Sequence, residues 1–255
     1  MTAPRPRLSV FIATAPRSGS WLLAESLRHL DVGRPEEFFR ADLETDYREQ
    51  WGLPPAAPYL DFVDRVLTLG QAPNGVFAVK VHWFQFAMLL GRLRATHEGG
   101  DEVSDVGLLE RPFGNVRLVY LERTDTLRQA ISWARAIRTN EWWSIEGSAA
   151  PGGGLVPEYD FETIKHLYYL LCDYKRCWRE WIARSGLRPV EVSYEALARD
   201  HDAAVHRVVA ALGLPVPQRI WPPRLVRQAD GNTEALARAY QDSWRSLFDQ
   251  HAHAP

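Results

Sequence analysis

Three short apolar runs, each followed by a stretch of helical periodicity, constrain the fold more than any other feature of this chain. The runs, paired with the stretches that follow them, are residues 10–13 with 21–30, 77–81 with 83–93, and 116–121 with 126–137. Each run has the length and composition of a buried strand, and each following stretch places apolar residues on one helical face. Strands that alternate with helices are typical of an α/β fold with a mostly parallel central sheet and helices on both faces. The sequence therefore predicts that fold class.

Further helices and one further strand continue the alternation. The periodicity predicts helices over 59–69, 161–183, 203–212 and 233–248, and a short strand over 190–192. Gly186 and Gly213 follow two of these helices, as is usual where a helix ends. Because a chain of 255 residues can enclose one large core, we interpret residues 1–255 as a single domain.

The charge balance and the apolar content exclude several broad classes of function. The formal net charge is −2, from 30 basic and 32 acidic residues, so no excess of positive charge points to nucleic acid or an anionic membrane surface. The apolar stretch at 8–15 is too short for a signal-peptide core or a membrane span. Cys172 and Cys177 fall on different faces of one expected helix, which argues against a disulfide, and no Cys/His cluster has zinc-site spacing. We therefore expect a cytoplasmic protein without a nucleic-acid, membrane or metal partner.

The loop between the first strand and the first helix has the composition of an anion-binding loop. Its sequence is Pro16-Arg17-Ser18-Gly19-Ser20-Trp21. The first amides of a helix lack internal partners and lie at the positive end of the helix dipole, so a phosphate binds well there. Gly19 lets the backbone approach a ligand closely, and Ser18 and Ser20 offer hydroxyl groups. Arg17 adds a planar fork of donors; the plain alternative is that Ser18 only caps the helix and Arg17 is a solvated charge.

Two segments resemble the donor site of sulfotransferases that use 3′-phosphoadenosine 5′-phosphosulfate (PAPS). Residues 16–21 are similar to the loop that binds the 5′-phosphosulfate in that family. The strand at 116–121 runs into Arg123, and the next helix carries Ser132, which is similar to the family's 3′-phosphate site. On their own, Ser132 would be a small helix residue and Arg123 a solvated cap. The resemblance implies a P-loop-like sulfotransferase fold, PAPS as donor, the desulfated nucleotide PAP as product, and no metal.

Four ordered motifs resemble the bacterial trehalose 2-sulfotransferase family, and together they extend over nearly the whole chain. They lie at 17–20, 35–39 (Pro-Glu-Glu-Phe-Phe), 123–132 and 227–230 (Arg-Gln-Ala-Asp). The resemblance implies a homodimer. We also expect Arg227 to contact the nucleotide, and the alternative for this residue is a surface charge that flanks a helix.

Two residues compete for the role of general base in the expected sulfuryl transfer. Glu37 lies in the motif where the trehalose enzymes are thought to keep their catalytic carboxylate. His82 ends the stretch Lys80-Val81-His82, which resembles the Lys-x-His strand end of eukaryotic cytosolic sulfotransferases, whose histidine is the base. The trehalose enzymes have no histidine there, whereas imidazole is the natural base near neutral pH and a carboxylate must be tuned by burial. We favour Glu37 as base and assign His82 to acceptor orientation or shared base work.

Lys80 and Arg17 complete the expected catalytic set. We expect Lys80 to reach the reacting group or the acceptor, and Arg17 to be a catalytic as well as a donor-binding residue. The plain alternatives are a solvated carboxylate at Glu37, a satisfied strand-end imidazole at His82 and a surface ammonium at Lys80.

The expected acceptor is a small hydroxylated molecule. The chain has ten tryptophans, whose faces stack on sugar rings, although at least half should be core residues. A trehalose-like disaccharide or other glycoside is the first choice and a glycosylated natural product the second, with residues 142–157 as a candidate lid.

Two rival functions use the same loop. A small-molecule kinase would need a lysine after Gly19, where the chain has Ser20. A regulatory nucleotide-binding module would keep Arg17, Arg123 and Ser132 without needing an acid–base pair.

Overall fold

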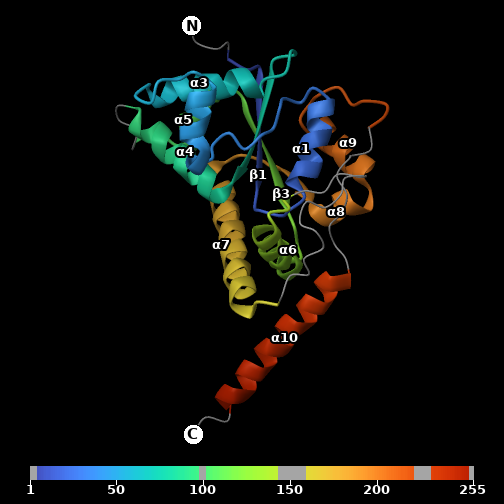
Figure 1. The fold of residues 1–255 in the computed structure, drawn as a ribbon. Helices are drawn as coiled ribbons and strands as arrows, with labels where there is room; N and C mark the ends of the chain where they lie inside the picture. The colour runs from blue at the N-terminus through green and yellow to red at the C-terminus, as the bar shows by residue number, and fades with distance from the viewer. Residues whose placement is uncertain (1–4, 98–101, 143–158, 221–230, 253–255) are drawn as a thin grey trace. The chain divides into compact units, whose positions relative to one another are not determined.

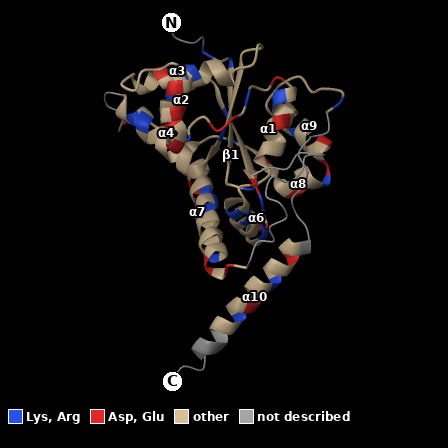
Figure 2. Ribbon diagram, in the orientation of Figure 1, with Lys and Arg blue, Asp and Glu red and all other residues tan. Residues whose placement is uncertain are grey.

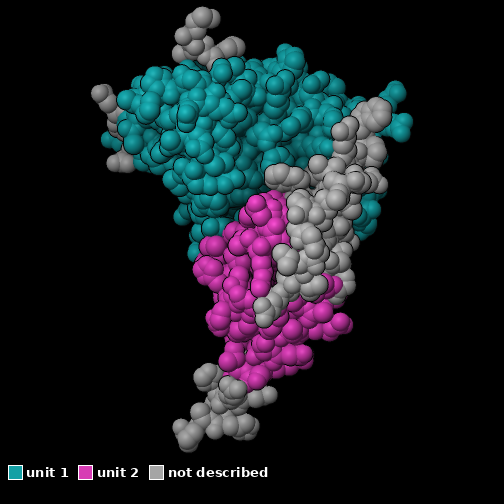
Figure 3. Space-filling model, in the orientation of Figure 1, with its two compact units in different colours: residues 1–122, 174–222 teal, residues 123–173, 223–255 magenta. Residues whose placement is uncertain are grey.

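The structure, a computed structural model, describes residues 5–97, 102–142, 159–220 and 231–252. The chain divides into two compact units (Figure 3): residues 1–122 with 174–222, and residues 123–173 with 223–255. The long helix α7, Phe161–Ser185, contributes residues to both units. The interpretation of residues 1–255 as one domain stays a prediction.

A parallel four-stranded sheet forms the centre of the first unit (Figure 1). The strands are β1 (Leu8–Thr14), β2 (Val76–His82), β3 (Val116–Glu122) and β4 (Val190–Ser193), in the order β2-β1-β3-β4. All neighbouring pairs are parallel, with Thr14 opposite His82 and Ala13 opposite Tyr120. The carboxyl ends of the strands therefore meet at one edge of the sheet.

Helices cover both faces of this sheet, as the sequence predicts. Successive side chains of β1 point to opposite faces: Val10 and Ile12 join one apolar cluster, and Phe11 and Ala13 join the other. The first cluster is covered by α1 (Ser20–His29), α8 (Tyr194–Arg199) and α9 (His201–Ala211). The second is covered by α3 (Tyr59–Gly70), α4 (Trp83–Ala95), α5 (Asp105–Phe113) and residues 174–185 of α7. The predicted α/β class is confirmed.

The sequence does not predict three short helices and one 3-10 turn. They are the 3-10 turn Ala41–Leu43, α2 (Glu44–Gln50), α5 and α8. Helix α2 has no apolar stripe, and an ion pair of 2.9 Å between Arg48 and Glu44 links its first and last turns. Helix α5 contains Gly107 and Pro112, which weaken the helical signal, but Ser104 caps it by accepting a hydrogen bond from the Gly107 amide at 3.1 Å.

The second unit consists of helices. It contains α6 (Thr126–Thr139), residues 161–173 of α7, and α10 (Gly231–Ala252). Asp125 caps α6, and Arg128 joins this cap to α10 through ion pairs of 2.6 Å to both Asp125 and Glu234. The rings of Phe161, Tyr240 and Trp244 are in mutual contact.

Charged residues of both signs lie along α7 and α10 (Figure 2). Within the described ranges, no helix combines the length and the apolar character that a membrane crossing needs. Neither Cys172 nor Cys177 forms a disulfide.

Gly33 steers the chain from α1 to the edge of β2. Its φ is +68°, and a Cβ on it would lie 2.3 Å from the backbone nitrogen of Ala78. The next amide, that of Arg34, donates to the carbonyl of Gly70 at 2.8 Å. Only a residue without a side chain allows this close approach.

We expect Gly33→Ala to destabilise the protein far more than Gly186→Ala. Gly186 also has a positive φ, +73°, but no atom lies within 4 Å of a Cβ built there. The control substitution should therefore cost only the left-handed strain, about 1 kcal/mol. Gly33→Ala adds a backbone clash and should cost at least about 3 kcal/mol. Urea unfolding of the two variants measures the difference, and equal losses would show that the turn is not tight.

Candidate active site

The carboxyl ends of β1 and β2 bring most of the predicted site residues together. Thr14 and His82 end these strands side by side. Strands β2 and β3 lie on opposite sides of β1, so the winding of the chain reverses at β1. In open α/β sheets ligands bind beyond the carboxyl ends of the strands at such a reversal.

A short bridge to β2 places Glu37 at this edge. Glu36 pairs with Val79 in an isolated parallel bridge, and the Lys80 amide donates to the Glu36 carbonyl at 3.0 Å. Phe38 and Phe39, which follow, are buried in the apolar cluster on the α4 side of the sheet. The backbone bridge at Glu36 and the buried rings of Phe38 and Phe39 therefore fix the chain on both sides of Glu37.

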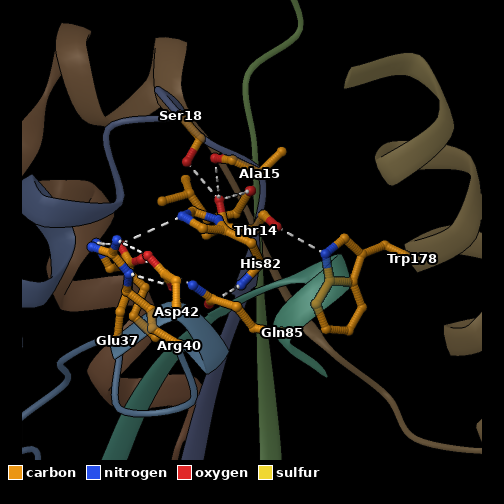
Figure 4. A network of polar contacts seen from close by, with 11 residues as sticks. Thr14, Ala15, Ser18, Glu37, Arg40, Asp42, His82, Gln85 and Trp178 are labelled. Carbon is orange, nitrogen blue, oxygen red and sulfur yellow. Dashed lines mark hydrogen bonds and ion pairs between the residues drawn. The ribbon is translucent and has the colours of Figure 1, made fainter. Parts of the chain in front are cut away.

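The Glu37 carboxylate is held by three side chains (Figure 4). Its Oε1 lies 2.7 Å from Lys80 Nζ and 3.4 Å from His82 Nε2, and its Oε2 accepts a hydrogen bond from Gln85 Nε2 at 3.0 Å. Gln85 is itself fixed, because its Oε1 accepts from the His82 amide at 2.9 Å. Sequence reasoning missed Gln85. Its position at the third residue of α4, after a strand-end histidine, was the available signal.

Burial and charge act in opposite directions on this cluster. Burial raises the pKa of Glu37 and is the largest single influence, but His82 and Lys80 together outweigh it and hold that pKa well below the usual range. Burial lowers the pKa of Lys80, and Glu37 partly offsets that decrease. The carboxylate is therefore ionised at neutral pH and stabilises a lysine whose side chain has no exposed surface. The plain alternatives of a solvated glutamate and a surface lysine are wrong.

The loop after β1 is tight and strained. Arg17 has a φ of +62° although it is not a glycine, and such residues cluster at functional sites. Gly19 has a φ of +78°, and a Cβ on it would lie 2.6 Å from the ring of Tyr194. Arg17 is partly exposed, whereas Ser18 and Ser20 are buried.

Two buried hydrogen bonds secure this loop to the sheet and to α7. Thr14 Oγ1 donates to the Leu121 carbonyl at 2.8 Å and lies 2.5 Å from Ser18 Oγ. Because the Thr14 proton is already committed, Ser18 is the donor in that second contact. Trp178 Nε1 donates to the Thr14 carbonyl at 2.8 Å (Figure 4). The Ser18 proton therefore points into the protein, and Ser18 braces the loop in this state.

Trp21 lies against Lys80. Its ring centroid is 3.6 Å from Lys80 Nζ. The sequence predicts Trp21 to be a nucleotide-binding residue, and in the structure its ring contacts the cluster around Glu37.

The remaining predicted site residues belong to the second unit or lie outside the residues that the structure describes. Arg123, which follows β3 directly, is buried, and Ser132 is half-buried on α6. Their convergence with the loop at 16–21 stays a prediction. Arg227 lies outside the described residues. The same holds for the whole 227–230 motif and for 143–157 of the candidate lid.

Trp83 in the first unit and Trp142 in the second lie in different environments. Trp83 packs against the apolar cluster on the α4 side, with its ring centroid 5.2 Å from that of Trp178. Trp142 is exposed and donates from Nε1 to Asn140 Oδ1 at 3.0 Å. Trp83 therefore fits the structural interpretation better than stacking on an acceptor.

Among the described residues, no group of three or more His, Cys, Asp or Glu side chains is arranged to hold a metal ion. Lys80, Arg17 and Arg40 are among the described cations near this edge of the sheet in the first unit. The expectation that the chemistry proceeds without a metal stays a prediction.

Comparisons with known proteins agree with the motifs. The Stf0 sulphotransferase family matches residues 9–243. A trehalose 2-sulfotransferase of Mycobacterium tuberculosis is 30% identical, covering 94% of this chain and 95% of its own. A trehalose 2-sulfotransferase of Mycolicibacterium smegmatis is 29% identical over 90% and 93%. The crystal structure of a sulfotransferase from Alicyclobacillus acidocaldarius is 14% identical over 94% and 93%, with a TM-score of 0.47.

We expect the Glu37–Lys80 pair to stabilise the fold in a pH-dependent way. Glu37→Gln and Lys80→Met should each lower the free energy of unfolding at pH 7 by about 3 kcal/mol, because each leaves a buried group unpaired. The double variant should lose less than the sum. Since the pKa of Glu37 is lowered on folding, the advantage over Glu37→Gln is full above the ordinary glutamate pKa of about 4.3 and shrinks below it. Urea unfolding at pH 7 and pH 3 measures both effects.

An exposed pair supplies the matched control. Lys165 and Glu162 lie 2.6 Å apart on α7, with Glu162 73% exposed. The same substitutions there should show a coupling below about 0.5 kcal/mol. Equal couplings in the two pairs would mean that burial does not strengthen the Glu37–Lys80 interaction.

Proposed function

The chain belongs to the Stf0 sulphotransferase family, and we propose from this premise that it transfers the sulfuryl group of PAPS to a hydroxyl of a small sugar such as trehalose. The observation that carries the proposal is the buried cluster of Glu37, Lys80 and His82 at the carboxyl edge of the sheet, where β1 ends and its tight loop begins. The two trehalose 2-sulfotransferases support the choice of a sugar acceptor. A glycosylated natural product is the second candidate.

The loop at 16–21 suits the phosphosulfate end of the donor. It opens helix α1, whose first amides and dipole favour an anion. Arg17 is partly exposed and has a strained backbone conformation, as is common at functional sites. Ser18 would have to turn its hydroxyl away from Thr14 to donate to a ligand. Arg123, Ser132 and Arg227 are proposed for the 3′-phosphate and the nucleotide from the family motifs alone.

Proton removal from the acceptor is assigned to the Glu37–His82 pair. Sulfuryl transfer needs an in-line hydroxyl, a group that takes its proton, and positive charge near the leaving phosphate. Glu37 Oε1 lies 3.4 Å from His82 Nε2, so the two side chains can act together on the hydroxyl of the acceptor. The low pKa of Glu37 makes it a weaker base than an isolated carboxylate. His82 is therefore assigned a larger share in removing the proton of the acceptor hydroxyl. Lys80 supplies positive charge from the same cluster.

We further propose that each chain forms a single domain, that two chains form a homodimer, and that the protein works in the cytoplasm. The family resemblance supports the dimer, and the two cysteines without a disulfide fit a reducing compartment.

Calorimetry with PAP and with ADP plus magnesium tests the donor assignment. We expect PAP to bind without metal and more tightly than ADP with magnesium. Arg17→Ala should weaken PAP binding by roughly 10- to 100-fold, because a charge-assisted hydrogen bond is lost. The control Arg65→Ala removes the same charge from an exposed position on α3 and should bind normally. A preference for ADP with magnesium would support the kinase instead.

Turnover of a disaccharide panel by two variants tests the acid–base assignment. Glu37→Gln and His82→Ala should both bind PAP as the wild type does. We expect Glu37→Gln to lower kcat by at least about 100-fold, because it removes the carboxylate that contacts Lys80 and His82. A comparable loss in His82→Ala alone would transfer the base role to histidine. Normal turnover in both variants would contradict both assignments, and PAP binding without turnover of any acceptor would favour the regulatory module.

A further inference from the structure

Lys80 is buried on the face of the sheet that α1 covers. Strand residues alternate between faces, and Val76 and Ala78 of β2 belong to the apolar cluster on the α1 side. Lys80 continues that series, and its neighbour in register on β1 is Ile12. The ammonium group therefore emerges from the sheet beneath the first turn of α1, where Trp21 lies.

Two described groups approach the Lys80 ammonium closely. Glu37 Oε1 is 2.7 Å from Nζ, and the centroid of the Trp21 ring is 3.6 Å from it. The face of an indole ring attracts a cation, most strongly where water is excluded. Lys80 has no exposed surface, so this condition is met. The carboxylate and the ring together surround a charge that would otherwise be strongly destabilised by burial.

The choice of lysine at this position is unusual for this chain. The sequence contains three lysines, Lys80, Lys165 and Lys175, against 27 arginines. Arginine stacks on aromatic rings as well as lysine does, but it is bulkier and remains charged at all relevant pH values. The chain uses arginine at nine of every ten Lys and Arg positions, yet the fully buried cation on β2 is lysine, the smaller group and the one that can titrate.

We propose that Trp21 is a positioning residue of the proposed sulfotransferase, whose indole face keeps the Lys80 ammonium charged and fixed on the Glu37 carboxylate. In this proposal Trp21 acts through its contact with Lys80 rather than through a contact with the nucleotide. The consequence for turnover rests on the proposed function, whereas the contact and its effect on Lys80 do not. The simpler interpretation is that Trp21 only fills space, since its side chain also packs against the apolar cluster on the α1 side.

The titration of Lys80 in the substrate-free protein separates these interpretations. With only three lysines, isotope-labelled lysine side chains give a spectrum of three signals, and Lys165→Arg and Lys175→Arg identify the other two. Trp21→Leu keeps apolar bulk without a π face, and Trp21→Phe keeps a weaker π face. We expect the pKa of Lys80 to fall by about one pH unit in Trp21→Leu and by less than half of that in Trp21→Phe.

The charged groups around Lys80 stay the same in these variants. Glu37 and Glu36 raise the pKa of Lys80 and Arg40 lowers it, while His82 shares the Glu37 carboxylate. None of these groups lies on α1, so a changed titration reports the ring. An unchanged pKa of Lys80 in Trp21→Leu would overturn the proposal. If Trp21→Leu does not fold, Trp21→Phe decides alone: a lowered pKa supports the proposal and an unchanged one overturns it.

Kinetics then distinguish positioning from nucleotide binding. In both variants we expect kcat to fall, by about tenfold in Trp21→Leu and less in Trp21→Phe, with the alkaline limb of the pH profile moving to lower pH together with the Lys80 titration. PAP affinity should remain within about twofold of the wild type. A loss of PAP affinity with an unchanged Lys80 titration would assign Trp21 to the nucleotide instead. A shifted titration in a protein that binds no PAP would contradict the proposed function and leave the Trp21 contact intact.

Discussion

A fully buried ammonium group needs an anion beside it, and several segments of the first unit together place the Glu37 carboxylate next to Lys80. The turn at Gly33 brings the chain against β2. The bridge between Glu36 and Val79 then fixes the backbone, so that the Glu37 carboxylate lies 2.7 Å from Lys80 Nζ. Without that carboxylate, the charge on Lys80 would be strongly disfavoured. The same carboxylate contacts His82, so the residue that compensates the buried charge of Lys80 also belongs to the proposed acid–base pair.

The loop that begins at the end of β1 is secured from a different direction. Thr14 lies opposite His82 in the sheet, its hydroxyl donates to the next strand, and its carbonyl accepts from Trp178. These bonds hold the start of the loop while Arg17 keeps a left-handed backbone conformation. A strained loop that is tightly held loses little further freedom when an anion binds, which favours affinity. Thr14 therefore connects the proposed acid–base cluster to the loop proposed for the donor.

Sequence reasoning succeeded where the signal was local. The buried strands and most of the helices are visible as apolar periodicity, and the motif around Glu37 and the pair Lys80 and His82 are visible as residue types in order. It did less well with α2, α5 and α8, because α2 is stabilised by ion pairs and α5 contains residues that oppose a helix. The sequence also predicts that Ser18 offers its hydroxyl to an anion, and in the structure that hydroxyl lies 2.5 Å from Thr14 Oγ1.

The sequence by itself determined the α/β class, the prediction of an anion-binding first loop and the candidates Glu37, Lys80 and His82, because these depend on periodicity and residue chemistry. Only the tertiary structure decided that the three candidates share one carboxylate, that Gln85 and Trp21 join them, and that the pKa of Glu37 is held low. The physical reason is that a pairing across strands and a balance between burial and charge depend on distances between segments far apart in the chain. No local pattern of residues encodes those distances.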